Sequence, residues 1–253
     1  MEGHVNLNVA DGIATIEFYH PQSNSMPGHL LRQLTKTVEQ AGNDPLARVI
    51  VLRSAGQKAF CAGASFDELM SIADLEQGRV FFSGFAGVIN AMRKAPKFVL
   101  CRVQGKAVGG GVGIASAADY TFGTKDSSVK LSELAVGIGP FVVGPAVERK
   151  VGRSAFAQLS IDAANWRSAD WAKENGLFAD VYADEAAMDA AIGALALRLS
   201  NSSPEAMAEL KRVLWQGTEH WDTLLAERAE ISGRLVLSDF TRDFIAHFKQ
   251  GQR

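Results

Sequence analysis

Two short segments rich in glycine and alanine could stabilise negative charge on an oxygen atom. Residues 109–111 are three glycines that follow an apolar run over residues 98–103 and precede small residues suited to a tightly packed helix. Glycine lets the backbone approach a ligand closely, and the first N–H groups of a helix have no partner within it. The second segment is residues 61–64, Cys-Ala-Gly-Ala. If both meet at one edge of the core, the N–H groups of Ala64 and Gly110 could point at one thioester carbonyl oxygen. The alternative is that the glycines only allow a helix to cross a strand closely.

Glu133 is the acidic residue whose surroundings suit proton transfer. It lies in the segment KLSELAVG, between a short extended piece and a glycine-rich turn. A carboxylate among apolar neighbours loses hydration, which raises its pKa and lets it act as a proton shuttle. The alternative is a solvated loop glutamate.

The composition argues against several other classes of function. The chain has 253 residues, 47% of them apolar, a net charge of -2 and no block of like charge, so we expect neither a nucleic-acid partner nor a membrane partner. Cys61 and Cys101 are far apart, and neither the cysteines nor the histidines have the spacing of metal ligands, so we expect no disulfide framework and no metal site. Because there is no signal-peptide pattern and no run of roughly 18 apolar residues, we expect a cytoplasmic protein.

Strands and helices must position the two glycine-rich segments and Glu133. A hairpin is predicted around Asp11-Gly12, a buried strand over residues 48–53, a loop over residues 54–64 and a helix over residues 75–93. Another helix is predicted after Ser25. Helical patterns dominate from residue 146, with helix starts at Ser168, Asp184 and Pro204. The pattern predicts an α/β core over residues 1–195 and a helical C-terminal region over residues 196–253.

Three blocks of the sequence resemble the signature of a known family. They are AFCAGASFDEL, VQGKAVGGGVGIASAADY and KLSELAVGIGP, and in this order they are similar to blocks of the crotonase superfamily, the enoyl-CoA hydratase/isomerase family. The likeness covers nearly the whole chain, from HPQSNSM, which resembles the family's HP-x-x-x-N-A-L segment, to Ser168-Ala169 and Gly176-Leu177.

The resemblance implies a crotonase-like spiral of ββα units and a helical C-terminal region used in trimer contacts, in a homotrimer or a dimer of trimers. It implies an acyl-CoA substrate and no separate cofactor, since coenzyme A is part of the substrate. By position, the two oxyanion-hole amides fall on Ala64 and Gly110, and the acid/base falls on Glu133. Lys58 resembles a position near the CoA phosphates, and Lys249 is a further candidate for that role. The other implied substrate-binding positions are Ala62, Gly63, Ser65, Phe66, Gly109, Gly113, Pro140 and Phe141.

The chain departs from the family pattern at one catalytic position. Typical hydratases of the family carry two glutamates, but here the first position is Gly113 and only the second, Glu133, is acidic. Hydration requires one group to activate a water while a proton reaches the α-carbon, and two carboxylates divide that work. A single glutamate beside an oxyanion hole can instead move a proton between two carbons of a dienolate. The pattern therefore resembles that of the family's 3-enoyl to 2-enoyl isomerases.

The sequence leaves three alternatives to isomerisation open. The first is hydration or dehydration with another group in place of the first glutamate. The second is thioester hydrolysis, whose branch of the family usually has an aspartate where this chain has Phe141. The third is a non-catalytic trimer that only binds acyl-CoA.

Overall fold

Two β-sheets form the frame of the molecule. The computed structural model describes residues 3–251, and the side chains of residues 3–247. In the larger sheet the strands lie in the order β1 (His4–Ala10), β2 (Ile13–Tyr19), β3 (Val49–Ser54), β5 (Val99–Val103), β7 (Tyr120–Thr124) and β10 (Asp180–Tyr182). In the smaller sheet the order is β4 (Ala59–Cys61), β6 (Lys106–Val108), β8 (Ser128–Lys130) and β9 (Arg167–Ser168).

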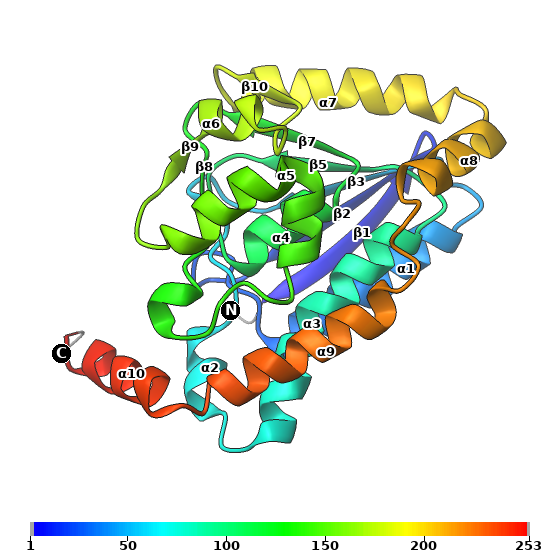
Figure 1. The fold of residues 1–253 in the computed structure, drawn as a ribbon. Helices are drawn as coiled ribbons and strands as arrows, with labels where there is room; N and C mark the ends of the chain where they lie inside the picture. Colours follow the sequence, from blue (N-terminus) through cyan, green and yellow to red (C-terminus); the bar gives the residue numbers. More distant parts are fainter. Residues whose placement is uncertain (1–2, 252–253) are drawn as a thin grey trace.

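The chain winds as a spiral, and three of its turns place one strand in each sheet before a helical segment (Figure 1). Strands β3 and β4 lead to α2 (Phe66–Ser71) and α3 (Leu75–Lys94), and β5 and β6 lead to α4 (Gly110–Ala117). Strands β7 and β8 lead to the short 3-10 helix η1 (Leu134–Val136) and to α5 (Gly144–Ile161). The predicted spiral of ββα units is therefore confirmed. The predicted loop over residues 54–64 is wrong in part, because β4 lies within it and pairs with β6.

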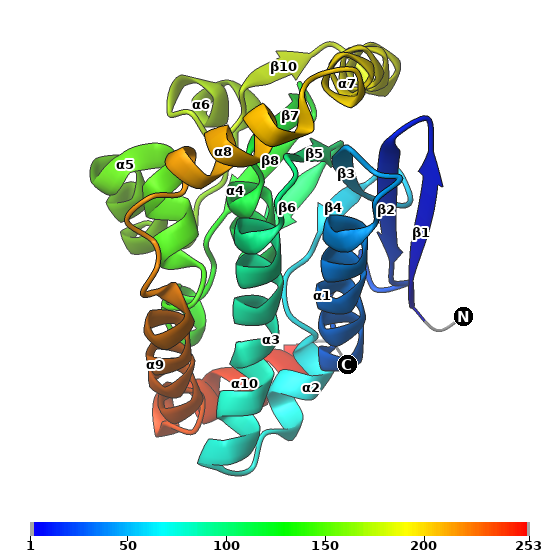
Figure 2. The ribbon, with the colours of Figure 1, turned by 90° about the vertical axis from the view of Figure 1, so that its right-hand side faces the viewer.

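The hairpin and the helices of the first half follow from local sequence. Strands β1 and β2 pair antiparallel around Asp11 and Gly12, which both have positive φ, as predicted. Helix α1 (Gly28–Asn43) buries an apolar stripe of Leu30, Leu31, Leu34, Val38 and Ala41. Helix α4 is buried along its whole length, and its small residues suit its place in the middle of the molecule (Figures 1 and 2).

The C-terminal helices pack back onto the spiral. They are α6 (Ala169–Glu174), α7 (Glu185–Ser200), α8 (Pro204–Leu214), α9 (Trp221–Leu235) and α10 (Asp239–Gly251). The predicted helix starts at Ser168, Asp184 and Pro204 are confirmed. Helices α1, α3 and α9 run side by side (Figure 2), and a Cβ added at Gly78 of α3 would lie 2.8 Å from the Gly233 Cα of α9. The division predicted after residue 195 falls inside α7.

A buried cation ties α8 to the ends of the central strands. The Lys211 Nζ donates hydrogen bonds to the carbonyl oxygens of Met92, at 2.8 Å, and Lys97, at 2.7 Å. It also lies 3.0 Å from the carboxylate of Asp119, whose other oxygen accepts a hydrogen bond from the indole of Trp215 at 2.7 Å. These buried charges are paired, which fixes the C-terminal region on the spiral. Within residues 3–251, none of the helices combines the length and the hydropathy that a bilayer crossing requires.

Candidate active site

The two glycine-rich segments meet at a cavity of about 190 Å³ between the spiral and α9. Most of the residues predicted as catalytic or substrate-binding contribute to its lining. They are Ala62, Gly63, Ala64, Phe66, Gly109, Gly110, Glu133, Pro140 and Phe141. The structure therefore brings together residues from three separate turns of the chain.

The close approach of the two segments depends on Gly63. This residue has φ +88°, and a Cβ added there would lie 2.9 Å from the Val108 carbonyl oxygen and 3.7 Å from the Gly110 nitrogen. A larger residue would be strained and would push the segments apart. The N–H groups of Ala64 and Gly110 donate no hydrogen bond to any residue between 3 and 251. Two free backbone donors therefore lie on the wall of one cavity.

The turn of residues 20–26 holds the first of these segments in place. The Ala62 N–H donates to the Ser23 carbonyl oxygen at 3.1 Å, and the Met26 N–H donates to the Gly63 carbonyl oxygen at 2.8 Å. The Ser65 N–H donates back to Met26 at 3.4 Å. These bonds run on both sides of Ala64 and leave its own N–H free.

Asn24 is the residue that connects this turn to the neighbouring strands. It has φ +57° and is buried. Its amide nitrogen donates to the carbonyl oxygens of Ala55, at 2.8 Å, and Ala59, at 2.9 Å, and its Oδ1 accepts from the His20 N–H at 2.9 Å. Ser25 was expected just before a helix. Its hydroxyl instead bonds the His20 ring at 3.0 Å, and α1 begins two residues after Met26, at Gly28.

The carboxylate of Glu133 lies against the second glycine-rich segment. A Cβ added at Gly109, which has φ +51°, would lie 3.0 Å from the Glu133 Oε1. The residue as a whole is half-buried, but its Oε2 is shielded from water and accepts no hydrogen bond from the described residues. Burial raises the pKa of Glu133 to about 7, because the charged form loses hydration, and none of the described lining residues is a cation. At neutral pH this carboxyl group can therefore either accept or donate a proton.

Val143 fills the space beside Gly113, the position of the missing glutamate. A Cβ added at Gly113 would lie 2.4 Å from the Val143 Cγ1, so no side chain fits there without movement. Val143 begins the approach to α5 and itself lines the cavity, as does Val142. The place of a second carboxylate is therefore apolar.

Three predicted binding residues do not line the cavity. Lys58 is exposed just before β4, and its carbonyl oxygen accepts a hydrogen bond from the Lys106 N–H at 3.5 Å. Ser65 is buried and caps α2, where its hydroxyl accepts from the Glu68 N–H at 3.4 Å. Gly113 is covered by Val143. The side chain of Lys249 lies outside the described residues.

Several lining residues were not predicted. Phe85 belongs to an apolar stripe of α3 that its helical spacing assigns to the core, and it is both buried and in the cavity wall. Ser232 comes from α9, far along the chain, where no local motif marks it. The others are Leu69, Phe82, Val108, Ser132, Val136, Ile138, Val142 and Val143. Among the described lining residues, Glu133 is the only one with an ionisable side chain.

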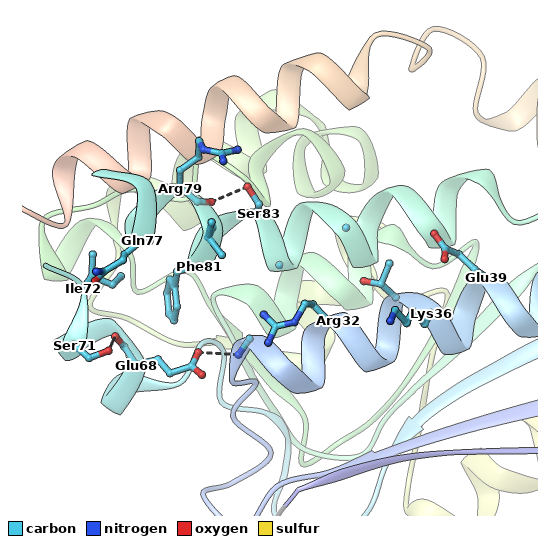
Figure 3. Close-up of a pocket in the computed structure, with 15 residues that line it drawn as sticks. Arg32, Lys36, Glu39, Glu68, Ser71, Ile72, Gln77, Arg79, Phe81 and Ser83 are labelled. Atoms are coloured by element: carbon cyan, nitrogen blue, oxygen red, sulfur yellow. Dashed lines mark hydrogen bonds between the residues drawn. The ribbon is translucent and has the colours of Figure 1, made fainter. Parts of the chain in front are cut away.

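A larger cavity, of about 680 Å³, lies between α1, α2 and α3 (Figure 3). Its walls carry exposed charged side chains, among them Arg32, Lys36 and Arg79. Glu68 points to the start of α1, where it accepts a hydrogen bond from the Gly28 N–H at 2.7 Å. None of the predicted catalytic or binding residues lines this cavity, so its size does not make it the candidate site. Among residues 3–251 there is also no group of three His, Cys, Asp or Glu side chains placed to hold a metal ion.

Known proteins are similar to this chain over most of its length. A family model described as "Enoyl-CoA hydratase/isomerase" matches residues 8–242. The chain is 26% identical over 251 residues to the probable enoyl-CoA hydratase of Bacillus subtilis (strain 168), covering 98% of this chain and 96% of that protein. It is 27% identical over 208 residues to the mitochondrial Delta(3,5)-Delta(2,4)-dienoyl-CoA isomerase of Mus musculus, covering 78% and 63%. The crystal structure of enoyl-CoA hydratase from Bacillus halodurans superposes with a TM-score of 0.88 at 17% identity, covering 96% and 99%, which shows a shared fold. The range matched by the family model includes every residue that lines the cavity.

Proposed function

Because this chain belongs to the enoyl-CoA hydratase/isomerase family and is an enzyme of that family, we propose that it moves a double bond in a short acyl-CoA, converting a 3-enoyl thioester to a 2-enoyl thioester. One observation carries this proposal. Glu133 is the only ionisable side chain among the described lining residues, and Val143 occupies the space of a second carboxylate. The proposed reaction needs one acid/base and no activated water.

Binding of the thioester would use the two free backbone donors. In the proposal the N–H groups of Ala64 and Gly110 both donate to the thioester carbonyl oxygen. Negative charge grows on that oxygen when a proton leaves the neighbouring carbon, so donors already in place stabilise the transition state more than the substrate. Because Lys58 is exposed just before β4, the proposal assigns it to the CoA phosphates.

The proton moves in two balanced steps. The Glu133 carboxylate removes a proton from C2, and the electrons of the C–H bond form a dienolate whose charge rests on the thioester oxygen. The neutral Glu133, whose carboxyl proton can exchange with solvent, then delivers a proton to C4. The carbonyl group re-forms, the double bond moves from C3–C4 to C2–C3, and the carboxylate is regenerated. A carboxyl group with a pKa of about 7 suits both steps, since neither its acid nor its base form is strongly disfavoured.

Hydration is the second candidate reaction, since the relative from Bacillus subtilis is called a probable enoyl-CoA hydratase. Adding water to a 2-enoyl thioester requires a group that holds and deprotonates the water while another delivers a proton to C2. In this cavity Val143 lies beside Gly113, where such a group would be needed, and Val142 also lines the wall. This apolar wall favours isomerisation over hydration.

The two reactions are separated by assaying the full chain with 3-hexenoyl-CoA and with 2-hexenoyl-CoA in deuterium oxide. We expect the first to give 2-hexenoyl-CoA, with deuterium at C2 or C4, and the second to give no 3-hydroxy product. Glu133→Gln should lower the isomerisation rate by about a hundredfold to ten-thousandfold. Rapid formation of 3-hydroxyhexanoyl-CoA would establish a hydratase. Binding of both thioesters without turnover or deuterium uptake would establish a non-catalytic binding protein.

We also propose that the chain assembles as a homotrimer or as a dimer of trimers, as other members of the family do. An apolar surface on α8 supports assembly, because Leu210, Val213 and Leu214 are each about half exposed in the single chain. Light scattering should give three or six times the 27.1 kDa mass of one chain. The variant Leu214→Glu should shift the mass toward one chain, and a wild-type mass of one chain would contradict assembly.

A further inference from the structure

Ser232 presents a hydroxyl group to the cavity without a partner in the protein. The residue lies on α9, is 1% exposed and belongs to the cavity lining. Its hydroxyl forms no hydrogen bond with any described residue, whereas other helical hydroxyls, such as those of Thr35 and Ser160, donate to the carbonyl one turn earlier. The Ser232 oxygen is not among the fully buried side-chain atoms that lack a partner, which fits an oxygen open to the cavity, where a ligand can bond to it.

The position of Ser232 separates it from the reacting atoms. In the proposed function, the donors at Ala64 and Gly110 hold the thioester oxygen, and Glu133 faces the carbons next to it. Ser232 comes from the C-terminal region and lies one helical turn before Val236, which packs in one apolar cluster with Leu69 and Ile138. Leu69 and Ile138 line the cavity as well. With the thioester bound as in the proposed function, this wall would contact the part of the acyl group beyond the reacting carbons.

The size and charge of the cavity limit what that part can be. The cavity volume, about 190 Å³, is slightly larger than that of the roughly 150 Å³ protein cavities that hold benzene, which fits a short acyl group. The described lining contains no Lys, Arg or His. A second carboxylate on the acyl chain would lose its hydration beside Glu133 with no cation to pair with. The group that meets Ser232 is therefore neutral.

We propose that Ser232 determines substrate class by hydrogen bonding to a neutral oxygen, a hydroxyl or a carbonyl, on a short acyl chain beyond the reacting carbons. This inference rests on the proposed function, because it concerns the substrate of the same site. A cavity built to bond such an oxygen discriminates against acyl groups that lack it, since the protein hydroxyl is then left unpaired.

Binding of saturated thioesters tests the proposal without requiring turnover. Isothermal titration of the full chain would compare hexanoyl-CoA with its 4-, 5- and 6-hydroxy derivatives and with adipoyl-CoA, which carries a carboxylate. Ser232→Ala should weaken binding of at least one hydroxy derivative by on the order of tenfold and leave hexanoyl-CoA unchanged or tighter. Adipoyl-CoA should bind the wild type more weakly than hexanoyl-CoA. The matched control Ser83→Ala removes a hydroxyl from α3 outside this cavity and should change none of these affinities.

The outcomes separate this inference from the proposed reaction. Equal effects of Ser232→Ala on hexanoyl-CoA and on every hydroxy derivative would overturn the inference, even for an active isomerase. Tighter binding of adipoyl-CoA than of hexanoyl-CoA would overturn it as well. Selectively weaker binding of a hydroxy derivative by Ser232→Ala would support the inference, even if 3-hexenoyl-CoA were not isomerised. Only the proposed isomerisation would then be contradicted.

Discussion

The chemistry available to this protein depends on how one carboxyl group is solvated. No described residue of the cavity lining is a cation, and Glu133 lies against the backbone at Gly109 with one oxygen shielded from water. Burial alone raises its pKa to about 7. A carboxyl group with an ordinary pKa would be a weaker base and would seldom carry a proton at neutral pH. Loss of hydration therefore gives Glu133 a pKa that suits both halves of the proposed proton transfer.

The pH dependence of the reaction follows from this pKa. The carboxylate form is the base, so kcat/KM for 3-hexenoyl-CoA should rise with pH, reach half its maximum near pH 7 and level off above it. Initial rates measured from about pH 5 to about pH 9 check this profile. A midpoint near 4.5, the ordinary value for glutamate, would show that Glu133 is solvated in the working enzyme.

The same burial costs stability when the group is charged. The folded-state pKa, about 7, lies above the ordinary value of 4.5, so the stability contributed by neutral Glu133 is complete below pH 4.5 and is lost as pH rises through 7. Glu133→Gln cannot ionise. Its free energy of unfolding in urea should exceed that of the wild type at pH 8 by on the order of 3 kcal/mol, with a much smaller excess at pH 5.

A surface glutamate provides the control for this comparison. Glu174 is exposed on α6, and Glu174→Gln should change the free energy of unfolding little at either pH. An equal gain from Glu133→Gln at pH 5 and at pH 8 would mean that its effect comes from packing and not from charge.

At the scale of elements, the free backbone donor at Ala64 depends on a turn that does not touch the cavity. Residues 20–26 bond to both sides of Ala64, and Asn24 anchors that turn to the segment between β3 and β4. A backbone N–H stabilises a transition state only when it is held at the right distance before the reaction begins. The turn therefore positions a donor that belongs to another part of the chain.

Replacing Asn24 tests this coupling. Asn24→Asp tolerates the positive φ and keeps an acceptor for His20, but it loses both donations to Ala55 and Ala59. We expect kcat for 3-hexenoyl-CoA to fall by on the order of tenfold with a smaller change in KM, because the loss falls on the transition state. Steady-state kinetics with 3-hexenoyl-CoA measure kcat and KM separately. The control Ser23→Gly changes an exposed side chain at the neighbouring positive φ and should keep kcat. A rise in KM with unchanged kcat for Asn24→Asp would contradict the coupling.

At the scale of the whole molecule, the C-terminal helices complete the cavity. Helix α9 lies along α3 and contributes Ser232 to the wall, while Lys211 of α8 bonds to the ends of α3 and of the central sheet through Met92, Lys97 and Asp119. Because these contacts are buried, the C-terminal region and the spiral should unfold together.

Variants of Lys211 and Asp119 test whether contacts between α8 and the spiral stabilise the folded protein. Lys211→Met leaves the charge of Asp119 buried without its partner, which should cost about 3–5 kcal/mol in the free energy of unfolding. Adding Asp119→Asn removes that charge and should recover part of the loss. Urea denaturation of the two single variants and the double variant measures the interaction as a cycle. Strictly additive losses would show that the two groups act independently.

The sequence by itself determined the elements and the segments that carry the chemistry. The Asp11-Gly12 hairpin, the capped helix starts at Ser168 and Asp184, and the order of the three family blocks depend on local conformational preferences and on spacing, which can be seen without a fold. The glycines of residues 109–111 and the missing glutamate at Gly113 are equally visible. The roles proposed for Ala64, Gly110 and Glu133 began as predictions from these motifs and stay so until they are assayed.

Only the tertiary structure decided what surrounds those residues. That Val143 occupies the space beside Gly113, that Ser232 of α9 reaches the cavity, and that the Glu133 carboxylate is shielded from water all depend on which distant segments pack together. The strand β4 was missed for the same reason, since three residues form a strand only when a neighbour such as β6 supplies the hydrogen bonds. Local spacing fixes the shape of each segment, whereas solvation and cavity shape arise from packing between segments, because burial is a property of neighbours and not of sequence position.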